Sequence, residues 1–479
     1  MKKPNVLLIC SDHWPGSFLG CAGHDVIMTP TLDSLASKGI RFQNYFSECP
    51  VCIPARRSMM TGLSPKSHGD RVYSDRMTMP DAITLAQAFK NNGYQTYAVG
   101  KLHVYPQRDR IGFDDVILQE EGRYEFGVVD DYQIWLGENG YTGMEFMHGM
   151  GNNTYYTRTW HLPENTHPTN WATREMMKQI KRKDPTKPAF YYLSYQFPHP
   201  PLVPIQAFLD MYKDEEIDAP EYGNWEDNDD VLELFKDAEK QYSPKEIIRA
   251  KKAFYAQCTH IDNQIRLLIG TLRECHLLDD TVIIFTSDHG DMLFDHHMVA
   301  KRLFYQNSCC VPFIVSGKPF YDKYKMAGVT SRKLGCHADL MPTLLDICGI
   351  EPPGDIDGAS LMSEYERNYI YGEVGEGTKA TRMICDGKYK LIYYPYGNVI
   401  QLYNIEEDPK EKNNLALTNN AEEIKNNLLN ILIRELNGSD LNWIKDGKLV
   451  GIPVSQANSN KLDFGLSNQR GYHWPPSIS

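Results

Sequence analysis

The residues best placed to do chemistry lie in one short stretch. Residues 52–62 read Cys-Ile-Pro-Ala-Arg-Arg-Ser-Met-Met-Thr-Gly. With Cys49, Cys52 also forms a Cys-x-x-Cys pair, which is typical of redox sites and of half a zinc site. No second pair follows, since Cys309 and Cys310 are adjacent, and the arginine of a cysteine phosphatase loop would fall on Ser58. A modified or nucleophilic cysteine and a structural loop cysteine are the interpretations that remain strongest.

The pattern Cys-x-Pro-x-Arg, with Thr-Gly a short step on, resembles the signature of the type I sulfatases of the alkaline phosphatase superfamily. The resemblance implies that a formylglycine-generating, sulfatase-maturing enzyme oxidises Cys52 to an aldehyde. One hydroxyl of the hydrated aldehyde attacks sulfur, and the other is deprotonated and expels sulfate as the aldehyde re-forms. A plain serine or cysteine would be left as a stable sulfo-ester that needs a second hydrolysis.

Two predicted strands end in acidic residues. The apolar run 6–10 leads to Asp12 and His13, and the run 281–286 leads to Asp288 and His289. Ligands gather at the carboxyl ends of parallel strands, so these carboxylates can converge on one cation. Both segments resemble those of the sulfatases, although the residue after the first Asp is commonly another Asp. The resemblance implies that a divalent metal is held by Asp12, His13, Asp288, His289 and the modified Cys52. Oxygen ligands favour Ca²⁺, and the imidazoles leave Mn²⁺ or Zn²⁺ open.

Further catalytic residues follow from the same resemblance. Gly-Lys-x-His supplies Lys101 and His103, one to neutralise sulfuryl oxygens and one to handle the proton of the aldehyde hydrate. If this segment is extended, the two side chains point the same way. His199, between prolines, is expected to protonate the leaving alcohol, and Lys301 to contact the sulfate and the leaving oxygen. Arg56 is expected to hold the hydrate and the metal carboxylates in register.

The elements around these motifs predict an α/β fold. Helices are expected over 81–90, 251–276 and 339–347, and they alternate with short apolar strands at 6–10, 96–99, 281–286 and 311–315. Such alternation is typical of a large, mostly parallel sheet flanked by helices.

The chain is expected to divide into a catalytic domain, 1–365, and a C-terminal subdomain, 366–479. Within the first, residues 125–245 are predicted to be inserted loops and short helices that face the substrate. The second shows alternating segments broken by glycine, typical of a small antiparallel sheet, and a helix over about 421–437. Glu373, Lys379 and Arg382 are polar candidates for substrate specificity.

Composition narrows the possible partners. The 479 residues carry a formal net charge of −12, which disfavours a nucleic acid. No segment approaches the roughly 18 apolar residues of a membrane-spanning helix. The apolar run after Met1-Lys-Lys is too short for a signal peptide, and the eleven cysteines form no disulfide framework, so a cytoplasmic location is expected. The oligomeric state stays open.

These observations favour a sulfatase that hydrolyses a sulfate ester or sulfamate, with a small sulfated carbohydrate as the expected substrate. A phosphonate monoester or phosphodiester hydrolase of the same superfamily is the nearest alternative, because its machinery overlaps and His13 fits it equally well. A non-catalytic anion-binding protein with unmodified Cys52, and a redox protein that uses Cys49 and Cys52, are further alternatives.

Overall fold

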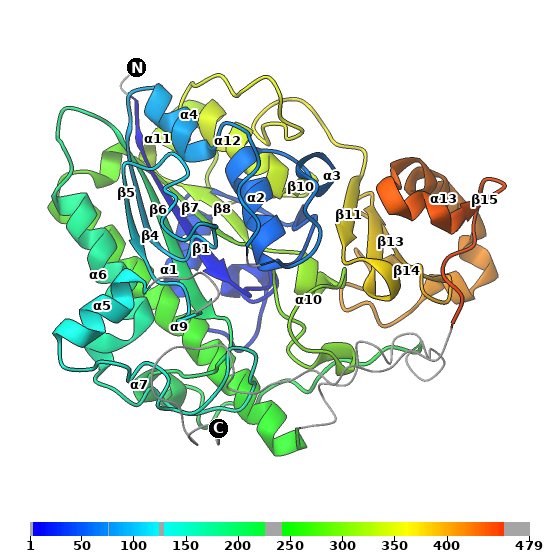
Figure 1. The fold of residues 1–479 in the computed structure, drawn as a ribbon, viewed down its shortest axis with the longest axis horizontal. Coiled ribbons are helices and arrows are strands. Elements are labelled where there is room, and N and C mark those ends of the chain that lie inside the picture. The colour runs from blue at the N-terminus through cyan, green and yellow to red at the C-terminus, as the bar shows by residue number, and fades with distance from the viewer. Residues whose placement is uncertain (1–2, 75, 124–128, 226–241, 455–479) are drawn as a thin grey trace.

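A broad sheet forms the centre of the molecule (Figure 1). The computed structural model describes residues 3–74, 76–123, 129–225 and 242–454, and within them this sheet has eight strands. In spatial order they are β5 (Asp115–Leu118), β4 (Gln95–Gly100), β6 (Ala189–Pro198), β1 (Asn5–Asp12), β7 (Thr281–Ser287), β8 (Phe313–Ser316), β2 (Ile40–Phe42) and β9 (Val329–Ser331). The run from β5 to β7 is parallel throughout, whereas β8 is antiparallel to both β7 and β2. The predicted mostly parallel α/β fold is confirmed.

Alternating side chains of the central strands pack on two helical layers. Leu7 and Ile9 of β1 belong to the core under α1 (Pro30–Ser37), α6 (Pro168–Lys181) and α9 (Pro244–Glu274). Val6 and Leu8 point to the opposite core, under α2 (Cys52–Thr61), α4 (Leu85–Asn91), α11 (Lys318–Tyr324) and α12 (Leu340–Ile347). Because both faces are covered, consecutive residues of the central strands are buried, and the middle of β1 (residues 6–10) is an unbroken apolar run, as is typical of buried parallel strands. Figure 1 shows the two helical layers on either side of the sheet.

Five further α-helices lie in the described residues, and all but α13 have at most eight residues. They are α3 (Pro65–His68), α5 (Asp131–Glu138), α7 (Gln206–Asp210), α10 (Gln306–Cys309) and, near the C-terminal end, α13 (Glu422–Glu435). None of the helices in the described part of the chain has the length and apolar character needed to cross a membrane.

A second, antiparallel sheet lies to one side of the first, as expected (Figure 1). Its strands follow in chain order: β11 (Ile370–Val374), β12 (Thr381–Cys385), β13 (Tyr389–Tyr394) and β14 (Val399–Asn404). Ile384 and Leu391 pack on one face with Leu428 and Leu432 of α13. Met383 and other residues of the opposite face pack on the segment that follows β7. Two small ribbons, β3 (Tyr45–Phe46) with β10 (Gly335–Cys336) and β15 (Ile444–Lys445) with β16 (Lys448–Leu449), complete the sheets.

Two predicted helices begin at other residues than expected. Helix 81–90 begins at Leu85, because Thr84 caps it and accepts from the N–H of Gln87, so Ile83 is left 48% exposed. Helix 251–276 begins earlier, at Pro244, where Ser243 and Glu246 form a capping box.

The largest correction concerns residues 125–245. The expectation of loops and short helices is wrong for β6, which is a fully buried strand paired with β1 and β4. Residues 125–128 and 226–241 of this region, and 455–479 of the C-terminal subdomain, lie outside the described residues. The division at residue 365 stays a prediction.

Candidate active site

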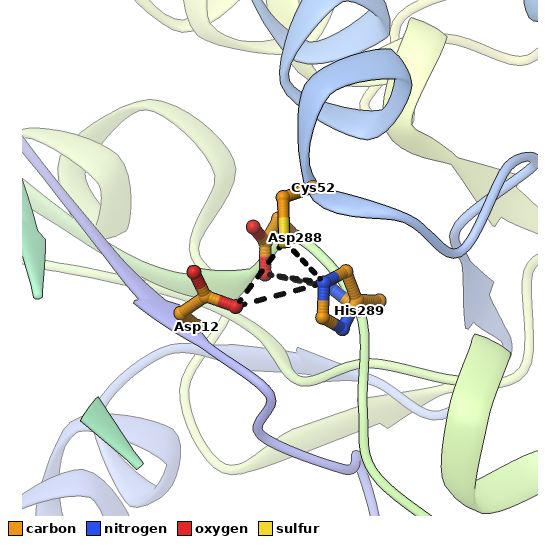
Figure 2. Close-up of side chains that lie close together, drawn as sticks. All are labelled: Asp12, Cys52, Asp288 and His289. Atoms are coloured by element: carbon orange, nitrogen blue, oxygen red, sulfur yellow. Dashed lines mark hydrogen bonds and ion pairs between the residues drawn. The ribbon is translucent and has the colours of Figure 1, made fainter. Parts of the chain in front are cut away.

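The two predicted acidic strand ends lie side by side. β1 and β7 are neighbouring parallel strands, with Ser11 paired to Ser287, so Asp12 and Asp288 leave the sheet at the same edge. Asp12, Asp288 and His289 are all fully buried. Figure 2 shows these three side chains converging with Cys52, which reaches them from another element. The sheet topology therefore produces the expected convergence of carboxylates.

Cys52 is the first residue of α2 and is buried. Its Sγ lies 3.1 Å from Nε2 of His289 and 3.9 Å from Oδ1 of Asp12. Burial and Asp12 act to raise the pKa of the thiol, but Lys301, Lys101 and His289 outweigh them and hold its pKa below the ordinary value. Cys49 is buried as well, but there burial, followed by the charge of Glu373, raises the pKa of the thiol well above the ordinary value. The two cysteines of the Cys-x-x-Cys pair thus lie in opposite electrostatic environments.

Among the described residues, two groups of side chains that share Asp12 could hold a metal ion; the smaller consists of Asp12, His13 and His199. Asp12, Cys52, Asp288 and His289 each offer one atom, and these atoms all lie within 4.8 Å of one another. Cys52 Sγ stands for the oxygen that a formylglycine would place there. Two carboxylates, an imidazole and that oxygen are a donor set that fits a divalent cation.

Arg56, one turn along α2 from Cys52, holds these groups together. Its Nε donates to Oδ2 of Asp288 at 2.9 Å, and one terminal nitrogen lies 3.5 Å from Asp12. The other terminal nitrogen donates to the Ser194 hydroxyl on β6 at 2.8 Å and to the Lys101 carbonyl at 2.9 Å. A buried guanidinium with this many acceptors links α2 to three strand ends.

Lys101 and His103 both lie at the site, but not as an extended pair. β4 ends at Gly100, and His103 has a φ of 60°, so the expected alternation of their side chains is wrong. The backbone turns because a carboxylate oxygen of Glu120 accepts from the N–H groups of Leu102 and His103, at 2.8 and 2.9 Å. Lys101 Nζ contacts the carboxylates of Asp12 and Glu121, which raise its pKa against the effect of burial.

His13, His199 and Lys301 form a second group at the same edge. Nε2 of His199 lies 3.2 Å from Lys301 Nζ, and the rings of His13 and His199 are 4.1 Å apart between centroids. Nδ1 of His13 lies 2.6 Å from Oδ2 of Asp291, and its Nε2 contacts Lys301 Nζ. Burial, followed by Lys301, lowers the pKa of His199 to about 3.

Two residues of the site did not emerge from the sequence. Glu121 is fully buried and links Lys101 to Arg123, and Asp291 orients His13. Glu121 follows β5, the neighbour of β4, so the rule that ligands gather at strand ends would have found it once that strand was assigned. Asp291 was visible only as part of the Asp288 motif.

Glu373 and Arg382 do not serve as exposed specificity residues. Arg382 is fully buried and its Nε donates to Asp440 at 2.7 Å, while Glu373 accepts from Arg71 at 3.0 Å. Arg71, in the loop after α3, thus joins the N-terminal half of the chain to the second sheet, and the Arg382–Asp440 pair lies within the C-terminal part, so both expectations are corrected. Lys379 lies in an exposed turn.

Comparison with known proteins agrees with this geometry. The model of the Sulfatase family matches residues 4–350, and that of the N-sulphoglucosamine sulphohydrolase C-terminal region matches residues 294–437. An arylsulfatase of Clostridium perfringens (strain 13 / Type A) is 36% identical, over 95% of this chain and 98% of its own. A choline-sulfatase of Rhizobium meliloti (strain 1021) is 28% identical, over 86% of this chain and 82% of its own.

A solved structure, the phosphonate monoester hydrolase of Agrobacterium radiobacter, superposes with a TM-score of 0.77 at 22% identity. It covers 92% of this chain and 97% of its own. At that identity the likeness shows the fold alone. Since a family model spans residues 4–350 and a relative matches nearly the whole length, the chain belongs to the sulfatase family. It is an enzyme that hydrolyses sulfate esters.

Proposed function

We propose that the protein hydrolyses the sulfate ester of a small sulfated carbohydrate through a formylglycine hydrate at position 52. The observation that carries the proposal is the placement of Cys52 Sγ 3.1 Å from His289 Nε2, inside the group that includes Asp12 and Asp288. A redox or structural cysteine has no need of two carboxylates and an imidazole around it. The maturing enzyme that oxidises Cys52 is then an obligatory partner.

Asp12, Asp288, His289 and position 52 would hold the metal ion. We favour Ca²⁺ because three of these four donors are oxygens after maturation, with Mn²⁺ as the alternative. When bound, the cation supplies positive charge that polarises the sulfuryl group and the attacking hydroxyl.

His13 was expected among the metal ligands, and its contacts support a different role. The Asp291 carboxylate engages Nδ1, so Nδ1 carries the ring proton and Nε2 has a single lone pair. Nε2 can accept from the Lys301 ammonium or coordinate a cation, not both. Its contact with Lys301 supports the first role, in which His13 positions Lys301.

Lys101 and Lys301 are proposed to bind sulfuryl oxygens, and His199 to protonate the leaving alcohol. In the free site His199 is neutral, because burial and Lys301 depress its pKa to about 3. A sulfate bound by Lys301 offsets that positive charge, so substrate binding raises the pKa of His199 toward the range a general acid needs. His103, buried beside Lys101, is proposed to handle the proton of the hydrate.

The carbohydrate assignment is supported by the match of residues 294–437 to the C-terminal region of N-sulphoglucosamine sulphohydrolase. That match also keeps a sulfamate open as the scissile group. We further propose that residues 366–479 and the described loops of 125–245 shape specificity. The cytoplasmic location stays a prediction.

The test compares substrates on protein whose Cys52 has been converted by a co-expressed maturing enzyme. We expect kcat/KM for nitrophenyl sulfate to exceed that for nitrophenyl phenylphosphonate, and a panel of sulfated mono- and disaccharides to identify a better substrate still. A higher kcat/KM for the phosphonate would favour the phosphonate hydrolase alternative.

A further inference from the structure

Two arginine side chains flank the ring of Tyr73 at the edge of the active site. The guanidinium carbon of Arg123 lies 5.8 Å from the centre of this ring, and that of Arg302 lies 6.0 Å from it. The Tyr73 ring is 5.9 Å from the His103 ring between centroids. The Arg123–Tyr73–Arg302 cluster therefore adjoins a residue already proposed for catalysis.

Arg302 is held at this position by its backbone. Its N–H donates to the carbonyl of Pro50 at 2.9 Å, and its φ of 79° is uncommon for a bulky residue. It directly follows Lys301, whose ammonium faces His199. The side chain is exposed, and no ion pair or side-chain hydrogen bond joins it to another described residue. A strained backbone that presents an unpaired cation beside an active site points to a functional constraint.

Arg123 supplies the second cation and is largely buried, with 11% of its side chain exposed. Glu121 accepts from its Nε at 2.7 Å and also contacts Lys101, so the arginine is tied to the catalytic group. Burial acts to lower the pKa of Arg123, but Glu121, with smaller contributions from Tyr73 and Cys52, raises it. Among the described residues, no acceptor is hydrogen-bonded to its two terminal nitrogens. These donors remain available to a ligand.

We propose that the Arg123–Tyr73–Arg302 cluster recognises a second anionic group of the substrate, a carboxylate or a further sulfate near the scissile ester. The inference rests on the proposed function. Lys101 and Lys301 are the residues proposed to bind the scissile sulfuryl group, so these two guanidiniums are additional to them. A planar guanidinium can donate two parallel hydrogen bonds to two oxygens of one carboxylate or sulfate, and partial burial strengthens these hydrogen bonds. The net charge of −12 opposes a long polyanion at a distance, so the substrate expected here is a small, doubly charged molecule.

The test uses aryl sulfates that differ in one substituent: 3- and 4-carboxyphenyl sulfate, 3- and 4-carbamoylphenyl sulfate, and resorcinol disulfate. For the matured enzyme we expect kcat/KM to be about tenfold higher for at least one charged ester than for its neutral counterpart, as one charge-assisted contact supplies. Arg302→Gln should remove most of this ratio, and Arg302→Lys should keep part of it. Arg266→Gln, an exposed charge on α9, is the matched control and should leave the ratio as it is.

A binding experiment separates this inference from the proposed function. The Cys52→Ala variant cannot turn the esters over, so calorimetric titration gives their affinities whether or not maturation succeeds. We expect the carboxyphenyl ester or resorcinol disulfate to bind about tenfold more tightly than the carbamoyl ester, and Arg302→Gln in the same background to abolish the difference. Equal affinity for charged and neutral esters, or an equal effect of Arg302→Gln and Arg266→Gln, would overturn the inference. Absence of turnover by the matured enzyme would instead contradict the proposed function.

Discussion

Nε of Arg56 donates a hydrogen bond of 2.9 Å to Oδ2 of Asp288, and so joins the helix that carries Cys52 to the strand end that carries the metal candidates. Both groups are buried, and a buried ion pair of this kind fixes geometry more than it adds stability. The position of Cys52 relative to the proposed metal ligands therefore depends on one side chain of its own signature.

The first prediction separates the two cysteines of the Cys-x-x-Cys pair. Cys52→Ala should abolish turnover of nitrophenyl sulfate, because position 52 then carries no nucleophile. Cys49→Ala removes a buried thiol outside the metal group and should keep most of the activity, with a lower melting temperature as the cavity cost. Equal loss in both variants, together with a response to thiol reductants, would support the redox alternative.

The second prediction concerns the metal. Asp288→Asn removes one charged ligand and the partner of Arg56, so the purified variant should contain less Ca²⁺ and melt at a lower temperature than the wild type. Saturation with Ca²⁺ at 100 times its Kd should stabilise the wild type by about 2.7 kcal/mol. Metal content by mass spectrometry and melting with and without Ca²⁺ are the measurements.

Asp279→Asn, an exposed carboxylate before β7, is the control for this experiment and should behave as the wild type. Full activity of the wild type in excess chelator would contradict the metal assignment.

The third prediction concerns the leaving group. General acid catalysis contributes about 10²–10⁴-fold when the departing alcohol is a poor leaving group. His199→Ala should therefore slow a sulfated sugar by a factor in that range and slow nitrophenyl sulfate much less, because nitrophenolate leaves without a proton. Lys301→Ala should harm both substrates, since it is proposed to bind the sulfuryl oxygens. Equal losses for His199→Ala on the two substrates would return His199 to a structural role.

The fourth prediction concerns stability in acid. Burial lowers the pKa of His167 to about 3, below the ordinary value of 6.5. Between these pH values the unfolded chain binds a proton that the folded chain refuses, so the free energy of unfolding falls as the pH falls, by about 1.4 kcal/mol per pH unit for this group. His167→Gln should melt at a lower temperature than the wild type at pH 7.5 and lose less stability between pH 7.5 and pH 5. His276→Gln, an exposed residue, should keep the wild-type slope, and an identical slope in His167→Gln would contradict this origin.

The proximity of Asp12 and Asp288 was predictable because both residues lie at the ends of strands, within linear motifs. Asp12 and Asp288 meet because β1 and β7 are adjacent and in register, which a rule about parallel strands anticipates. The second sheet was predictable from its alternating pattern and glycine breaks, since hairpin pairing is local along the chain.

What could not be predicted depends on contacts between distant segments. The sequence pattern does not mark the tyrosine-rich strand β6, because a strand buried on both faces lacks the alternation that marks a half-buried one. The sequence does not reveal the ion pairs of Glu373 and Arg382, because only the fold brings Arg71 and Asp440 beside them. The turn at His103 likewise depends on Glu120, which lies just after β5 and accepts a hydrogen bond from the N–H of His103.

The most direct test of the account measures conversion of Cys52 and activity in the same samples. Conversion to formylglycine lowers the mass of the tryptic peptide that contains Cys52 by about 18 Da. Preparations made with increasing amounts of a co-expressed maturing enzyme should show a rate of nitrophenyl sulfate hydrolysis proportional to the converted fraction, and no rate at zero conversion. Full activity in a preparation whose Cys52 retains its thiol would show that hydrolysis does not require formylglycine at position 52.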